Sequence, residues 1–144
     1  MIIVDANLLI YAHNSSGRAH EQAKLWWEGM LNGYDEVGLA WTTMLAFLRV
    51  MTHARIIPNP MHLQDAIEIV RAWLARKNVK IVTPGAGHAA ILLRLLEDVG
   101  VGGNLTSDAH LAALALEYRA QVATTDVDFA RFGRVRWFNP CATR

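Results

Sequence analysis

The sequence predicts an α/β fold, with a mostly parallel central sheet that is flanked by helices on both faces. Short apolar runs rich in β-branched residues alternate with longer segments whose apolar residues recur at helical spacing, a pattern typical of parallel strands joined by crossover helices. The chain has 144 residues, of which 53% are hydrophobic, and that is enough for a substantial core. It contains no internal repeat, linker or low-complexity segment, so we expect one domain over residues 1–144.

The opening stretch MIIVDANLLIYAH predicts a strand that turns directly into a helix. Ile2–Val4 is a short β-branched run that favours a buried strand. Asp5 follows at once, and we expect Asn7 to cap a helix that carries Leu8–Ile10. In open α/β sheets, ligands bind at the carboxyl ends of the strands. Asp5 is therefore the first candidate site residue.

The remaining elements follow in the same alternation. We expect further strands at Val37–Trp41, Val79–Val82, Gln121–Thr124 and within Arg131–Phe138. We expect helices at Ala19–Leu31, Met44–His53, Met61–Lys77 and His88–Val99, and a last helix that reaches Tyr118. Thr42 or Thr43 is expected to cap the third helix, and Thr106 or Ser107 the last one. Trp26 and Trp27 lie about 100° apart around their helix, so we expect both in the core at different depths.

Composition limits the functions that are possible. The formal net charge is +1, which neither requires nor excludes nucleic acid as a ligand. Cys141 is the only cysteine, so an internal disulfide or a cysteine-based zinc site is impossible. There is no basic leader ahead of the first strand and no apolar run of membrane-spanning length, which favours a cytoplasmic location. The high apolar content suggests that a partner or a second copy covers part of the surface.

Four carboxylates are expected at one edge of the sheet. Asp126 and Asp128 follow the strand Gln121–Thr124, just as Asp5 follows the first strand. Asp108 lies in the first turn of the helix that leads into Gln121–Thr124. Parallel strands end at the same edge, and a crossover helix starts there. Asp126 and Asp128 also have a simpler interpretation as helix-capping residues, but the topology favours a shared acidic site.

Such a cluster favours a divalent cation. Two carboxylates about 4 Å apart repel each other by about 4 kcal/mol at an effective dielectric constant near 20. Protonation, separation or a bound cation relieves this repulsion. Because the donors are all oxygen atoms, Mg²⁺ is favoured over Zn²⁺, with Mn²⁺ as a possible substitute. We predict Asp5, Asp108 and Asp126 as metal ligands, and all four aspartates, including Asp128, as catalytic residues.

Cationic side chains are candidates for contacts to phosphate groups or to a protein partner. The candidates are Arg49, Arg55, Arg131, Arg134 and Arg136. Arg134 and Arg136 are expected to share one face of the last strand because they alternate along it. For His13 and His110 we favour structural roles over roles in the acidic site.

Three segments resemble the PIN-domain family and, within it, the VapC toxins of bacterial toxin–antitoxin pairs. MIIVDANLLIYA is similar to the opening strand of the family with its first acidic residue, Asp5. LTSDAHLAALALEY is similar to the segment that carries Asp108, and VATTDVDFARFGRVRWFNP to the closing segment with Asp126 and Asp128. Where the family usually has a second acidic residue, commonly Glu, this chain has Ala46.

The resemblance implies a PIN-like domain with Mg²⁺-dependent endoribonuclease activity. It further implies growth arrest by cleavage of RNA, neutralisation by a VapB-type antitoxin, and a homodimer. Because Ala46 replaces the expected Glu, the alternative is a catalytically weak or inactive PIN domain that binds RNA or protein.

Two other α/β functions fit the sequence less well. The residues 85–90, GAGHAA, match the G-x-G-x-x-A spacing of a dinucleotide site. That motif requires a following strand that ends in an acidic residue, and here a second helix is expected instead, so we predict no nucleotide cofactor. A phospho-receiver domain is rejected because Asp5 has no acidic neighbour and Val79–Val82 ends in Thr83 and Pro84.

Overall fold

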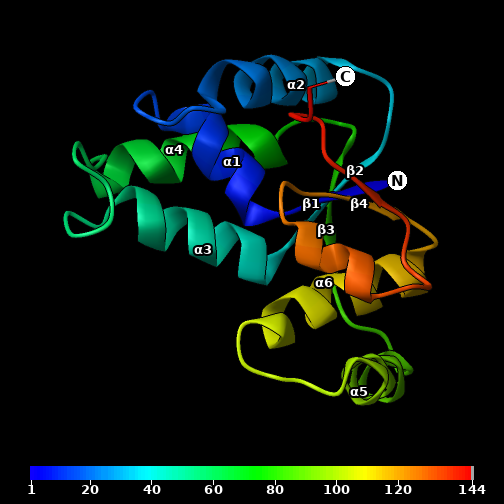
Figure 1. Ribbon diagram of the computed structural model, residues 1–144. Helices are drawn as coiled ribbons and strands as arrows, with labels where there is room; N and C mark the ends of the chain where they lie inside the picture. The colour runs from blue at the N-terminus through cyan, green and yellow to red at the C-terminus, as the bar shows by residue number, and fades with distance from the viewer. Residues whose placement is uncertain (144) are drawn as a thin grey trace.

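The computed structural model describes residues 1–143 and confirms the predicted fold class, with one five-stranded parallel sheet between two layers of helices (Figure 1). Arg144, the last residue of the predicted domain, lies outside the described residues. The sheet has the order β3-β2-β1-β4-β5, and all neighbouring strands are parallel. The strands are β1 (Ile2–Val4), β2 (Val37–Ala40), β3 (Val79–Val82), β4 (Gln121–Ala123) and β5 (Trp137–Phe138). The helices are α1 (Ala6–His13), α2 (His20–Asn32), α3 (Trp41–Met51), α4 (Leu63–Leu74), α5 (His88–Val99) and α6 (Leu105–Tyr118), with a 3₁₀ helix, η1 (Val127–Arg131).

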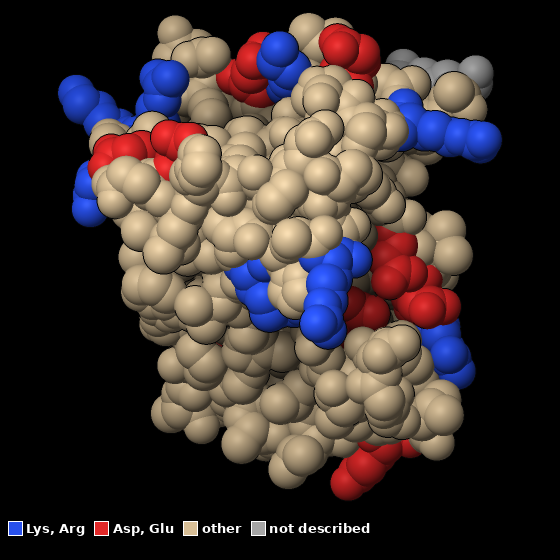
Figure 2. Space-filling model, turned by 90° about the vertical axis from the view of Figure 1, so that its left-hand side faces the viewer, with Lys and Arg blue, Asp and Glu red and all other residues tan. Residues whose placement is uncertain are grey.

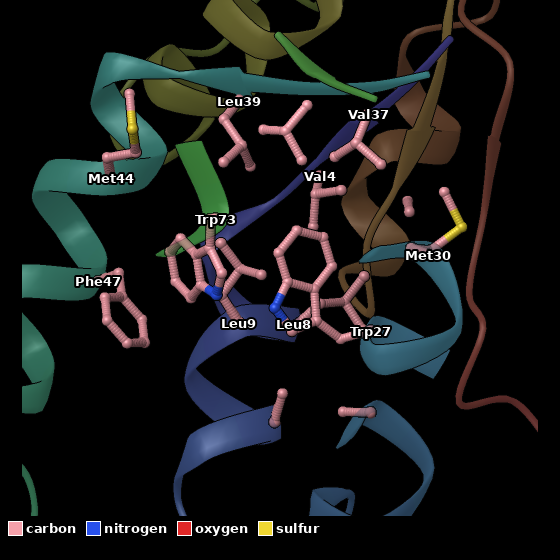
Figure 3. Close-up of a cluster of buried hydrophobic side chains, with 14 of the residues drawn as sticks. Val4, Leu8, Leu9, Trp27, Met30, Val37, Leu39, Met44, Phe47 and Trp73 are labelled. Atoms are coloured by element: carbon pink, nitrogen blue, oxygen red, sulfur yellow. The ribbon is translucent and has the colours of Figure 1, made fainter. Parts of the chain in front are cut away.

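The two faces of the sheet have separate cores because side chains alternate along each strand. Val4, Val37 and Leu39 point into the core beneath α1, α2, α3 and α4, whereas Ile3 and Ala40 point toward α5 and α6. The first core is rich in aromatic residues, and Figure 3 shows Phe47 of α3, Trp73 of α4 and Trp27 of α2 around Leu8 and Leu9 of α1. This packing holds α1, and with it the end of β1, in a fixed position.

The two tryptophans of α2 lie at different depths, as predicted. The side chain of Trp27 is buried, and its ring packs edge-on against Trp73. Trp26 is only partly buried and packs against Phe138 of β5. Both residues therefore contribute to the core on the α1 side of the sheet.

The predicted side-chain caps are wrong for α1 and α3. Asp5 and Ala40 precede these helices, and neither helix has a side-chain cap. The Thr43 hydroxyl donates instead to the carbonyl of Val4, 3.2 Å away, and Asn7 bonds to residues that follow β4. The last helix likewise starts after Asn104, with the Thr106 hydroxyl bonded to the Gly103 carbonyl. In each case the hydroxyl or amide finds a partner other than the expected helix N–H group.

Helix α5 is the peripheral element of the second layer and packs mainly on α6 (Figure 1). Only His88 and Leu95 of this helix are buried. His88 Nε2 lies 3.0 Å from Nδ1 of His110 on α6, and its Nδ1 lies 3.4 Å from Oε1 of Glu117. Among the helices of residues 1–143, none combines the length and the apolar character that a membrane span requires.

This histidine pair predicts a loss of stability in acid. Burial lowers the pKa of His110, His88 lowers it further, and Glu117 opposes the shift. The unfolded chain therefore takes up a proton near pH 6.5 before the folded chain does, and the folded state loses stability as the pH falls below that value. We expect the urea midpoint of the wild type to fall more between pH 7.5 and 5.5 than that of His110→Gln. His62→Gln, at an exposed position, is the control and should behave as the wild type; an identical pH dependence in all three proteins would contradict the prediction.

Candidate functional site

The four predicted aspartates lie at the carboxyl edge of the sheet. Asp5 joins β1 to α1, and its N–H donates to the carbonyl of Ala123 at the end of β4. Asp108 lies in the first turn of α6, and Asp126 and Asp128 follow β4 at the start of η1. Parallel pairing of Val4 with Ala123 brings these segments to one edge. The juxtaposition predicted from the topology is therefore present.

The electrostatics of this edge show that the carboxylates influence one another. Burial raises the pKa of Asp108 to about 6, and the charges of Asp5, Asp126 and Asp128 contribute to the shift. Burial also raises the pKa of Asp5, with a smaller contribution from Asp126. Ionisation of Asp5 and Asp108 therefore costs free energy, and a bound cation would offset this cost.

A cavity of about 110 Å³ opens between α1, α3 and α6 at this edge. Asp5 and Asp108 line it together with Ala46 of α3. The other lining residues are Ala6, Thr42, Thr43, Ser107 and Leu111. A carboxylate at position 46 would therefore face the same space as Asp5 and Asp108. With Ala46 at this position, the cavity has one carboxylate fewer than it would have with Glu.

Thr124 is a site residue that the sequence reasoning did not assign. Its fully buried hydroxyl donates to Oδ2 of Asp5, 2.7 Å away. The hydroxyl oxygen of Thr124 accepts hydrogen bonds from Nδ2 of Asn7 at 3.2 Å and from the backbone N–H of Asp126 at 3.0 Å. Thr124 thereby links Asp5 to Asp126 and fixes the orientation of the Asp5 carboxylate. The signal available in the sequence was a hydroxyl residue at the carboxyl end of an apolar strand, two residues before a candidate aspartate.

Asp126 has a local role as well. Its Oδ1 accepts the backbone N–H of Asp128 at 2.9 Å and so caps η1. The capping interpretation is therefore correct for Asp126, and it is compatible with a place at the acidic edge. Asp128 is exposed beside it.

The donor set fits a hard divalent cation in chemistry, although the side chains are spread. Within residues 1–143 no three His, Cys, Asp or Glu side chains lie close enough together to hold a metal ion. Hydrogen bonds engage Oδ2 of Asp5 and Oδ1 of Asp126, and mutual repulsion favours separation of the carboxylates. The donors are carboxylate oxygens at one edge of the sheet where the pKa of Asp108 is already raised, which suits Mg²⁺ or Mn²⁺.

One of the predicted arginines, Arg136, does not lie at this edge. Strand β5 begins only at Trp137, so Arg134 and Arg136 do not alternate along a strand as predicted. The Arg136 guanidinium donates to the carbonyl of Arg119, 3.4 Å away, just before β4. This contact places Arg136 at the amino edge of the sheet, opposite the carboxylates. The reason is that the chain after η1 returns to that edge before it enters β5.

The other predicted arginines are exposed on the surface. Arg49 is exposed on α3, three residues after Ala46, and Arg55 is exposed in the loop that follows this helix. Arg131 is exposed at the end of η1. Figure 2 shows basic side chains near the centre of one face of the molecule, with acidic side chains to their right.

The two histidines considered for the site have structural positions. His13 packs against the rings of Phe47 and Trp73, and its Nδ1 lies 2.8 Å from the carbonyl of Leu9. His110 faces His88 between α5 and α6. The structural interpretation favoured from the sequence therefore agrees with both positions.

The Thr124 network predicts a measurable defect in Thr124→Val, which keeps the shape of the side chain and removes the hydroxyl. Loss of the bond to Asp5 leaves a buried acceptor without its donor, which costs about 1–3 kcal/mol, so we expect a lower urea midpoint. The pKa of Asp5 should also rise, because that hydrogen bond now lowers it. NMR titration of the carboxyl groups measures the second effect. Thr125→Val is the matched control; equal behaviour of the two variants would argue against a positioning role for Thr124.

Comparison with known proteins agrees with this geometry. The PIN domain family model matches residues 2–135. Ribonuclease VapC37 of Mycobacterium tuberculosis (strain ATCC 25618 / H37Rv) is 47% identical over 142 residues, which cover 99% of each chain. Ribonuclease VapC33 of the same strain is 41% identical over 140 residues, which cover 97% of this chain and 98% of the relative.

Solved structures show the same fold at low sequence identity. One is a chain of the VapBC2 complex from Rickettsia felis, which was solved bound to a DNA fragment from its promoter. This chain aligns with the present protein with a TM-score of 0.70 and 17% identity, and the alignment covers 96% of the present chain and 98% of the VapBC2 chain. Mycobacterium tuberculosis VapC20, described as a toxin that cleaves the sarcin-ricin loop, has a TM-score of 0.69 and 18% identity over 92% and 95% of the two chains. With the family model covering nearly the whole sequence and relatives above 40% identity, this chain belongs to the PIN-domain family.

Proposed function

We propose that this protein is an endoribonuclease toxin of the VapC type, a hydrolase that cleaves phosphodiester bonds in RNA. The observation that carries the proposal is the acidic edge formed by Asp5, Asp108 and Asp126, in a chain whose relatives VapC37 and VapC33 are named ribonucleases. Asp128 lies beside Asp126 and completes the group.

PIN-domain VapC ribonucleases are in general metal-dependent, and for this chain we propose Mg²⁺, with Mn²⁺ as a possible substitute. Asp5 and Asp108 would hold the ion, and Asp126 would complete the set of ligands. A bound Mg²⁺ stabilises negative charge on the phosphate and lowers the pKa of a bound water.

The protein's own contribution is orientation and charge. Thr124 donates to Oδ2 of Asp5 and accepts from Asn7, which fixes one carboxylate oxygen of Asp5. Asp128 is exposed and free to orient water beside Asp126. The cavity beside Ala46 leaves room for the Glu side chain that the family usually has at this position.

We also propose the partners and the location. A VapB-type antitoxin would neutralise the toxin, consistent with a fold shared with VapBC complexes such as that of Rickettsia felis. A homodimer would cover apolar side chains that are exposed here, among them Trp41 and Leu45 of α3 and Leu93 of α5. With RNA as substrate, we place the protein in the cytoplasm.

Sequencing of RNA ends after brief expression tests the proposed activity directly. We expect growth arrest together with new 5′ ends at a small number of sites. Co-expression of a cognate VapB-type antitoxin should remove both. Growth arrest without new RNA ends would contradict the proposal and favour the alternative, a PIN domain that acts by binding alone.

A further inference from the structure

The loop after α3 forms a second cavity that the acidic site does not include. We call it the basic pocket; its volume is about 460 Å³, and its lining residues are Arg49, Thr52, His53, Ala54 and Arg55. No carboxylate lines it. Within residues 1–143 neither Arg49 nor Arg55 forms a salt bridge, so both guanidinium groups are available to an anion.

The basic pocket and the acidic cavity lie along one side of α3. Thr42 and Ala46 line the acidic cavity, and Arg49 and His53 line the basic pocket. The spacing of four and three residues puts Thr42, Ala46 and Arg49 on the same face of α3, and His53 follows two residues after the end of this helix. The rise from Ala46 to Arg49 is about 4.5 Å. A polymer that crosses the acidic edge along this face therefore meets the basic pocket next.

The pocket presents hydrogen-bond donors in a defined arrangement. The backbone N–H of Arg55 donates to Nδ1 of His53 at 3.1 Å. In the neutral imidazole this bond leaves the proton on Nε2, which makes that nitrogen a donor. One imidazole donor and two guanidinium groups match the acceptor oxygens of a phosphate, to which arginine binds in a bidentate fashion.

We infer that the basic pocket binds a backbone phosphate of single-stranded RNA next to the nucleotide held at the acidic edge; this inference rests on the proposed ribonuclease function. An acidic edge by itself repels the phosphates of its substrate, so the protein needs a compensating positive charge nearby. The basic pocket supplies that charge on the same face of α3. Its size and its donors suit a phosphodiester of any sequence, so its contribution is to position the chain, not to select bases.

RNA binding in an Asp108→Asn background tests this inference without cleavage. Fluorescence anisotropy with a single-stranded RNA oligonucleotide gives the affinity as a function of salt. We expect Arg49→Ala and Arg55→Ala each to weaken binding about fivefold at moderate salt. The slope of log K against log salt should become shallower by about 0.7 for each phosphate that the variant no longer neutralises. His53→Gln, which keeps a donor, should bind more tightly than His53→Leu.

The matched control is Arg76→Ala, an exposed arginine that lies in the short segment between α4 and β3. It should leave affinity and salt slope unchanged, and melting temperatures should show that every variant is folded. Equal effects of Arg49→Ala, Arg55→Ala and Arg76→Ala would overturn the assignment of the pocket. So would a result in which the Arg49 and Arg55 variants lose binding to an acidic antitoxin peptide and retain binding to RNA. Cleavage by the protein with Asp108 intact is scored separately, so failure of the ribonuclease proposal is distinguishable from failure of the pocket.

Discussion

Asp108→Asn should abolish RNA cleavage and growth arrest while leaving the protein folded. The substitution keeps the size of the side chain but removes a carboxylate that lines the acidic cavity beside Asp5. Loss of a charged group that stabilises the transition state at such a site lowers the rate by about 100-fold or more. Cleavage of an RNA mapped from the induced ends, measured in single-turnover reactions, gives the magnitude.

The stability of the same variant separates catalysis from folding. The pKa of Asp108 is raised to about 6 in the folded protein, above its ordinary value. At pH 7 the ionised Asp108 therefore opposes folding when no cation is bound, and Asn removes that cost. We expect a melting temperature equal to or above that of the wild type. Asp98→Asn, an exposed carboxylate paired with Arg94 on α5, is the control and should keep full activity. Retained cleavage in Asp108→Asn would falsify the catalytic assignment.

The acidic edge was predictable because it follows from topology. Asp5 comes directly after β1, Asp126 follows β4 after two threonines, and parallel pairing brings the ends of these two strands together. Asp108 follows from the direction of the crossover helix. No long-range contact had to be known, since the alternation of strands and helices determined the edge at which each carboxylate lies.

The parts of the site that the sequence did not predict depend on pairings between distant residues. Thr124 and Asn7 form a hydrogen bond across 117 positions of sequence, and Thr43 bonds to Val4. Local capping rules assigned Asn7 and Thr43 to helix ends, but the partners across the sheet satisfy these side chains instead. The hydrogen-bond partners of Asn7 and Thr43 are determined by contacts in the folded protein, and the spacing of residues in the sequence does not reveal them.

The positions of the arginines illustrate the same limit. A face shared by Arg134 and Arg136 required a strand through both residues, but the strand has only two residues and starts after them. The register of β5 is set by pairing with Val122 and Ala123, not by its own sequence. Arg49, in contrast, is placed by a long helix whose periodicity is clear, and its position one turn beyond Ala46 was predictable.

Ala46→Glu should increase the affinity of the site for Mg²⁺ by about tenfold or more, because a further carboxylate raises both the charge and the number of ligands. Ala46 lines the same cavity as Asp5 and Asp108, so the new side chain has space to reach it. Isothermal titration with Mg²⁺ measures the change. Ala72→Glu, at an exposed position of α4, is the matched control and should leave the affinity unchanged.

The effect of Ala46→Glu on stability should reverse sign with metal. Without a divalent cation, a further negative charge beside Asp5 and Asp108 adds repulsion at an edge where the pKa values of both are already raised. The melting temperature in EDTA should therefore fall below that of the wild type. In Mg²⁺ the tighter binding stabilises the folded state, by about 1.4 kcal/mol for a tenfold gain at saturating metal. We therefore expect Ala46→Glu to melt below the wild type in EDTA and above it in Mg²⁺. Neither a purely structural acidic edge nor a binding module without metal can produce this reversal. Shifts of the same sign and size in both buffers would contradict a metal centre at this edge.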